Sequence, residues 1–274
     1  MEFLIGLNVK PKEINNLNQV LFEDASGASA TPTESECIAY GFIPYKTVCY
    51  YQYNDTQMIP DTEILSIGRR NSIEENVLDS SVIGIDNFVF RNSNNNLIVG
   101  DSNTLNSISN TLISGTKGDA LYNNSQILAG NQNDDILGER QSILLLAGAD
   151  TTTSTYTRTY INDDGSTLFN VEDNSIVSYT AHAIGVRTGG TAAGDKGDFK
   201  YWIERGAVVS RNGTLTIDRT RDSISSDGTT SGWNVNSDID GTNLYIEVKG
   251  KNNMNVKWII RMEISEMRTG IDLS

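Results

Sequence analysis

The sequence has few of the side chains on which most metal sites and nucleophilic active sites depend. Its one histidine is His182, and its two cysteines, Cys37 and Cys49, lie far from it in the chain. A structural zinc site needs four such ligands, and a Cys-His nucleophile needs both members in contact. We therefore expect no metal ion, no cofactor and no catalytic residue.

Long apolar runs and basic clusters are also missing. No run approaches the roughly 20 apolar residues that cross a bilayer, and the start of the chain, Met1 to Leu7, lacks the basic region of an export signal. The net charge is −14, without a basic stripe. We expect no membrane insertion and no nucleic-acid partner. Cys37 and Cys49 could pair across a hairpin, but without a recognisable export signal the default is two reduced, buried thiols.

The most informative stretch contains glycines at a nearly constant period. A short apolar run precedes each of Gly68, Gly84, Gly100, Gly115 and Gly130, at spacings of 16, 16, 15 and 15 residues. After each glycine come polar residues, usually an asparagine, and then a second, weaker apolar step such as Phe88-Val89. A fixed period of this kind is typical of a solenoid, in which each coil packs only on its neighbours.

Each coil is expected to hold two short strands, with glycine and asparagine at the corners and the asparagines facing water. A coil this small encloses only a thin apolar strip, which is too little to offset the backbone entropy of folding. We therefore predict a parallel homotrimer with the apolar runs facing the common axis. The predicted trimer core consists of Ile83, Ile98, Val99, Ile113 and Leu128.

The predicted fold class is all-β, in three parts: residues 1–65, the repetitive shaft 66–150, and a C-terminal domain 151–274. All four prolines lie in the first part. That part also holds a cluster of aromatic residues, and Glu23 to Thr33 has the small, polar composition of an extended arm. We interpret residues 1–65 as an attachment segment that docks on a partner. The alternative is a small packed cap on the shaft.

The last part alternates apolar and polar residues, as in Leu244, Ile246 and Val248, between turn signals such as Asn212-Gly213 and Asp240-Gly241. Several short strands with such turns predict an antiparallel β-sandwich, similar to a jelly roll. Trp233 and Trp258 are expected in its core.

The same part resembles a known family. The segments that carry the resemblance are Asp173-Asn174-Ser175, 181–188, 201–206, 232–235, 243–250 and 256–259. Together they are similar to the C-terminal domain of bacteriophage tail-fibre and appendage proteins. The glycine repeat resembles the trimeric β-roll shafts of phage fibres and of bacterial trimeric adhesin heads.

This resemblance implies a homotrimeric structural protein of a virion, made in the host cytoplasm. Residues 1–65 would bind other virion proteins, and the C-terminal domain would bind a glycan or a protein on the host surface. The expected contact loops are 189–197, 223–232 and 251–255. Their candidate receptor-binding residues are Asp195, Lys196, Asp198, Ser226, Asp227, Lys251, Asn252 and Asn253.

Two other functions remain open. A polysaccharide-degrading tailspike enzyme needs two carboxylates in a groove, for which Asp134 with Asp135, or Asp195 with Asp198, are candidates. We read these pairs as solvated corners and expect no enzyme. A bacterial trimeric adhesin ranks lower because its export signal and anchor are not recognisable. In a trimer, three copies of His182 would also offer an axial ion site.

Overall fold

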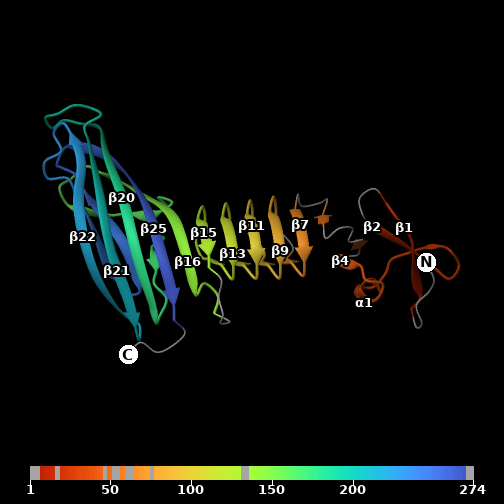
Figure 1. Cartoon of the computed structure of the whole chain (residues 1–274). Helices are drawn as coiled ribbons and strands as arrows, with labels where there is room; N and C mark the ends of the chain where they lie inside the picture. Colours follow the sequence, from red (N-terminus) through yellow and green to blue (C-terminus); the bar gives the residue numbers. More distant parts are fainter. Residues whose placement is uncertain are drawn as a thin grey trace.

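The computed structural model describes residues 7–15, 19–45, 48–50, 56–59, 64–74, 77–130 and 136–269. A small N-terminal unit, a shaft of stacked coils and a larger head follow one another along the chain, and Figure 1 shows the shaft between the other two.

The N-terminal unit is a five-stranded sheet with one short helix. Its elements are β1 (Val9–Ile14), β2 (Gln19–Asp24), β3 (Ser29–Ala30), α1 (Glu34–Ala39), β4 (Ile43–Tyr45) and β5 (Val48–Tyr50). The order is β1-β2-β5-β4, and β3 pairs with β2. Val20, Phe22 and Phe42 are buried together, so this unit has a core of its own.

Two expectations for this unit are wrong. Glu23 to Thr33 is not an extended arm, because β2 and β3 form a hairpin around a turn at Asp24 and Thr33 caps α1. Cys37 and Cys49 are not reduced thiols but form a disulfide. Packing of α1 against the sheet brings their Cα atoms to 5.7 Å, within the range for disulfides. Reasoning from the missing export signal took no account of this local geometry.

The glycine repeat folds as a β-solenoid, which confirms the predicted all-β fold class. One face is a parallel sheet of β7 (Ile64–Arg69), β9 (Ser81–Ile85), β11 (Leu97–Asp101), β13 (Leu112–Thr116) and β15 (Gln126–Ala129). The other face consists of β8 (Ser72–Ile73), β10 (Phe88–Val89), β12 (Thr104–Leu105) and β14 (Asp119–Ala120). Before the first coil, β6 (Thr56–Ile59) pairs antiparallel with β7.

Each coil buries apolar side chains inside its own chain. Val82, Ile98 and Ile113 are fully buried from one sheet, facing Val89 and Leu105 from the other. Ile98 and Ile113 therefore do not belong to a trimer core as predicted. Strand residues alternate between the two faces of a sheet, so Ile83, Val99 and Leu128 point outward instead.

The asparagines that follow the glycines are buried, contrary to the expectation that they face water. Asn87 and Asn103 have no exposed surface. The Oδ1 atom of Asn71 accepts from Nδ2 of Asn87 at 3.0 Å, and Asn87 accepts in the same way from Asn103 at 3.0 Å. Each Nδ2 also donates to a glycine carbonyl in the next coil, as from Asn87 to Gly100 at 2.7 Å. The ladder thus replaces water at a corner where backbone polar groups are buried.

The regular spacing of the glycines has a steric cause. Gly84, Gly100 and Gly115 occupy equivalent positions in consecutive coils and have φ between 122° and 138°. A Cβ atom at Gly100 would lie 1.8 Å from the carbonyl oxygen of Gly115. None of these three positions has room for a side chain. The period of the glycines therefore fixes the stacking of the coils.

The shaft sheet that contains β7, β9, β11, β13 and β15, called the outer sheet below, continues into the head. After β15 come β16 (Arg140–Thr151), β25 (Met254–Arg268), β20 (Ser175–Gly190), β21 (Phe199–Arg211) and β22 (Thr214–Asp227), all antiparallel. The short β18 (Tyr160–Ile161) also pairs with β16. A second sheet consists of β17 (Tyr156–Arg158), β19 (Phe169–Asn170), β23 (Asn234–Asp240) and β24 (Asn243–Lys249). Trp233 and Trp258 are buried, as expected.

We expect the buried asparagine ladder to be required for a stable shaft. Asn87→Ala removes the acceptor of Asn103 and leaves buried backbone groups unpaired, which costs about 1 to 3 kcal/mol for each group. The free energy of unfolding, measured with guanidinium, should fall by several kcal/mol. Asn106→Ala, an exposed asparagine of the next coil, is the control. Equal losses in the two variants would contradict a structural role for the ladder.

Candidate functional site

The outer face of the long sheet carries two rows of side chains along the shaft. One row, in register across neighbouring strands, consists of Ile67, Ile83, Val99, Ser114 and Leu128. The other consists of Leu65, Ser81, Leu97, Leu112, Gln126 and Leu144. With strands about 4.8 Å apart, the first row extends about 19 Å and the second about 24 Å along the shaft. We refer to this surface as the outer apolar face.

The same face continues on the head. Leu146, Ile184 and Ile259 point away from the core and are 40% to 52% exposed. Exposed apolar side chains thus occur on this face along the shaft and on the head, where the exposed ion pair of Arg261 and Glu263 lies beside them. A group of exposed apolar side chains on one face is typical of an interaction site.

A hollow of about 340 Å³ lies on this face where the shaft meets the head. Its lining residues are Leu112, Ser114, Gln126, Ile127, Leu128, Ser142, Ile143, Leu144 and Glu263. Small Ser114 and Ser142 flank Leu128 in the register of the strands, and Leu128 is 65% exposed. A protruding side chain thus lies beside a cavity on one surface.

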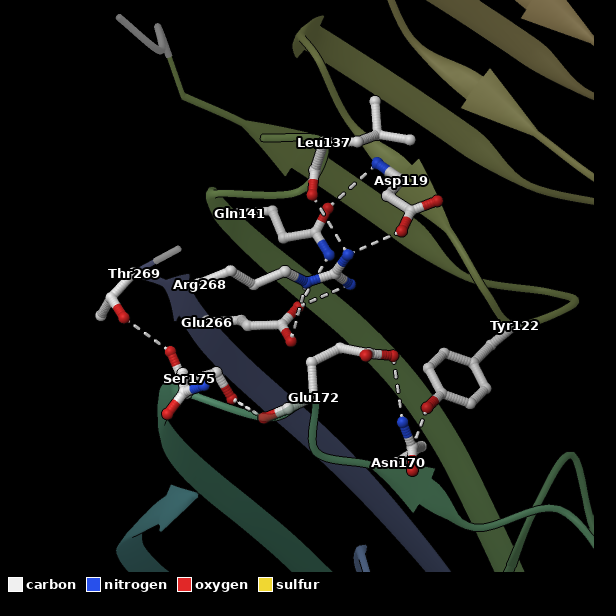
Figure 2. A network of polar contacts seen from close by, with 11 residues as sticks. Asp119, Tyr122, Leu137, Gln141, Asn170, Glu172, Ser175, Glu266, Arg268 and Thr269 are labelled. Atoms are coloured by element: carbon white, nitrogen blue, oxygen red, sulfur yellow. Dashed lines mark hydrogen bonds and ion pairs between the residues drawn. The ribbon is translucent and has the colours of Figure 1, made fainter. Parts of the chain in front are cut away.

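Arg268 links the head to the shaft through ion pairs, as shown in Figure 2. Its Nη1 donates to Asp119 of β14 at 2.7 Å and to the carbonyl of Leu137 at 3.1 Å. Its Nε lies 3.2 Å from the buried carboxylate of Glu266. Glu266 in turn accepts from Gln141 at 2.8 Å, and Gln141 accepts from the backbone of Asp119 at 3.1 Å. This network of polar contacts holds β16 and β25 of the head on the last coil of the shaft.

Tyr122 makes a second link between the shaft and the head. Its hydroxyl accepts a hydrogen bond from the backbone N–H of Asn170 at 2.7 Å, and its ring stacks on Phe169. Burial raises the pKa of Tyr122 above its usual value, so this phenol stays neutral.

The predicted contact loops gather at one end of the head. Ala192 donates to Asn253 at 3.0 Å, and Thr229 donates to Asp198 at 3.0 Å, which joins all three loops. Asp195, Lys196, Asn252 and Asn253 are exposed there, and Lys251 is partly exposed. Ser226 and Asp227 are exposed too, but they belong to strand β22 rather than to a loop.

Asp198 organises these loops from inside. It is 8% exposed and lies 3.8 Å from the buried guanidinium of Arg187. Arg187 donates to the carbonyls of Ala192 and Ala193 at 2.6 and 3.0 Å. Asp198 therefore supports the loop conformation and is not presented as a receptor contact.

A cluster of three polar side chains, Tyr179, Glu204 and Ser237, lies between the two sheets of the head. The Tyr179 hydroxyl and the Ser237 hydroxyl form a hydrogen bond, and Oε1 of Glu204 accepts from the hydroxyl and the backbone N–H of Ser237. The other carboxylate oxygen of Glu204 is buried and has no hydrogen-bond partner among the residues that the structure describes. Burial, with the nearby Glu204, raises the pKa of Tyr179 to about 12.

Nδ1 of His182 lies 2.7 Å from the Tyr201 hydroxyl, on the outer side of the long sheet. Asp134 and Asp135 lie outside the described residues. Among the residues that the structure describes, no three His, Cys, Asp or Glu side chains cluster as metal ligands would. In the same residues, no helix has the length and apolar character needed to span a bilayer.

No protein-family model matches the sequence, and no curated protein matches it. Several solved structures do. Tailspike protein gp49 of Acinetobacter baumannii bacteriophage Fri1, a capsular polysaccharide depolymerase, matches with a TM-score of 0.27 and 12% identity over 73% of this chain and 36% of that one. The tailspike of Acinetobacter baumannii phage AM24 matches with a TM-score of 0.28 and 7% identity, over 68% and 34%.

The tailspike of Acinetobacter phage vB_ApiP_P1 matches with a TM-score of 0.23 and 10% identity, over 72% of this chain and 49% of that one. The chain thus spans between about a third and a half of the length of these proteins.

One expectation from the sequence is corrected by these matches. We expected a protein that is not an enzyme, and the first of the matching tailspikes is a depolymerase. Reasoning from the repeat could not exclude catalysis, because loops can carry catalytic groups without any change in the spacing of the coils.

Removal of Arg268 is expected to weaken the junction. Arg268→Met leaves Asp119 and the buried Glu266 without their cation, and breaking a buried pair in this way costs about 3 to 5 kcal/mol. Arg261→Met is the control, since Arg261 pairs with Glu263 on the exposed face of β25 and such pairs contribute at most about 1 kcal/mol. Guanidinium unfolding followed by tryptophan fluorescence measures both. A loss below 1 kcal/mol for Arg268→Met would show that the network does not hold the junction.

Alkaline pH is expected to destabilise the head through Tyr179. Because its folded pKa lies above the unfolded value of about 10, its stabilisation is complete below pH 10 and is lost as the pH rises through about 12. The slope is at most about 1.4 kcal/mol per pH unit for one group. Tyr179→Phe should reduce the decrease in unfolding free energy between pH 10 and 12. If Tyr179→Phe has the same pH profile as the wild type, the loss of unfolding free energy comes from other titrating groups.

Proposed function

We propose that this chain is a subunit of a homotrimeric bacteriophage tail spike or fibre. Residues 1–65 attach it to other virion proteins, and the head contacts a glycan or a protein on the host surface. The resemblance of the repeat to phage shafts and of the head to phage-fibre C-terminal domains supports the virion assignment.

The outer apolar face is the observation that carries the proposal. Its two rows repeat at the spacing of the coils, so a partner that covers them needs the same spacing along the same direction. Another copy of this shaft, parallel to the first, meets that requirement. The exposed Leu128 next to a hollow of about 340 Å³ also favours self-association, because one surface supplies both the protrusion and its receptor.

A trimer around one axis also explains what the head gains. Three copies of a weak host-binding site on one rigid shaft act together, and multivalency of this kind raises avidity by about 100-fold to 10,000-fold without any new contact. The solenoid keeps the three heads at a fixed distance from the attachment end.

Solution mass tests the assembly. The purified chain should have about three times its mass of 30.0 kDa in light scattering. Val99→Asp combined with Leu128→Asp should give folded monomers, because both side chains are exposed on the coil and the introduced charges would be buried between copies. Leu121→Asp, which changes an exposed leucine on the other side of the coil, should stay trimeric.

A monomeric wild-type chain, or a double variant that remains a trimer, would contradict the proposed interface. Host contact is tested with the full chain, which should compete with virions for cells. The same incubation, assayed for new reducing ends in the surface polysaccharide, tests for cleavage.

A further inference from the structure

In the head, the edge of β23 is covered by side chains instead of another strand. β23 pairs with β24 on one side only. On the other side, Arg219 of β22 donates to the carbonyl of Ser237, and Arg221 donates to the carbonyl of Val235. Glu204 of β21 accepts from the N–H of Ser237 at 2.5 Å. These three side chains form hydrogen bonds with backbone groups of β23 that no neighbouring strand pairs with.

The space between these side chains is a hollow of about 390 Å³. It is lined by Glu204, Arg219, Thr220, Arg221 and Asn236. A volume of this size is typical of a small-molecule site, which ranges over roughly 300 to 1,000 Å³. We refer to it as the edge pocket.

The edge pocket contains polar groups that the protein does not use. Oε2 of Glu204, in a residue that is 1% exposed, accepts no hydrogen bond from any part of the chain that the structure describes. Each guanidinium has five N–H donors, and one nitrogen of each serves β23. The ring of Trp202 lies 5.6 Å from Arg221 and helps to fix its orientation. A buried, unpaired carboxylate oxygen is costly, so it favours a ligand that donates to it.

We propose that the edge pocket binds an acidic sugar unit, a hexuronate of a surface polysaccharide. The sugar carboxylate accepts from Arg219 and Arg221, and a neighbouring hydroxyl donates to Oε2 of Glu204. One hydroxy acid thereby satisfies both kinds of unused group. This inference rests on the proposed contact of the head with the host surface, and it names the class of ligand.

The carboxylate of Glu204 separates this ligand from a simple anion. Sulfate would meet the two arginines, but it has no hydroxyl to donate and its oxygens would be repelled by Oε2. Phosphate keeps one P–OH at neutral pH, but it carries this donor on the charged phosphorus centre itself, so its charge comes close to Oε2 in any orientation. A neutral sugar would satisfy Glu204 but would offer no charged acceptor to the N–H groups of Arg219 and Arg221 that do not serve β23 or Asp238. The pocket therefore selects a ligand that has an anionic group and a hydroxyl donor on one ring.

Calorimetric titration of the full chain tests the proposal, with an oligogalacturonate as the probe and a neutral oligosaccharide and inorganic phosphate as comparisons. Only the oligogalacturonate should bind. Glu204→Gln keeps the Oε1 acceptor for Ser237 and should weaken binding by about tenfold to a hundredfold, as expected for one hydrogen bond to a charged group. Arg221→Gln should weaken it further, and Arg221→Lys less.

Arg158→Gln is the matched control, because Arg158 pairs with Asp240 on the second sheet, away from the edge pocket. Circular dichroism confirms that each variant is folded. No binding of oligogalacturonate to the folded wild-type chain, or phosphate binding of equal strength that is unaffected by Glu204→Gln, would overturn the inference. Light scattering on the same sample separates this outcome from a failure of the assembly, since a monomer that binds the sugar refutes the trimer alone.

Discussion

The close approach of successive coils at the glycine corners is the constraint on which the rest of the structure depends. At Gly84, Gly100 and Gly115 the backbone of one coil lies where a Cβ of the previous coil would be. Backbone groups buried by this contact need partners, and Asn87 and Asn103 supply them from coil to coil. The steric requirement and the hydrogen-bond requirement are therefore met at one corner, and together they set the register of every strand in the shaft.

This register extends beyond the shaft. Because β15 pairs with β16, the outer sheet passes from parallel coils into the antiparallel head without a break. Arg268 and Tyr122 lock the same junction with polar contacts. A continuous sheet has a continuous face, so the face that carries the two rows of the coils runs on to Leu146 and Ile259 of the head, with the exposed ion pair of Arg261 and Glu263 beside them. Under the proposed function, this continuity lets one interface hold both parts of three chains.

The unpaired edge of β23 accounts for the charged side chains that lie between the sheets of the head. The antiparallel head ends in strands whose backbone groups have no further strand to pair with, and β23 receives arginine and glutamate side chains in place of one. The edge pocket lies among these side chains. The loops at the end of the head are held in another way, by Arg187 buried among their carbonyls.

The sequence by itself determined the solenoid and the all-β class, because the glycine period and the alternation of apolar residues are local signals of backbone approach and strand faces. It did not determine which apolar residue faces inward. Ile98 and Val99 are adjacent and equally apolar, and only the closing of the coil places one inside and the other outside. Tertiary structure also decided the burial of Asn87, the pairing of Cys37 with Cys49 and the meeting of Asp119 with Arg268, 149 residues apart. Such contacts depend on packing between distant segments, which no local pattern records.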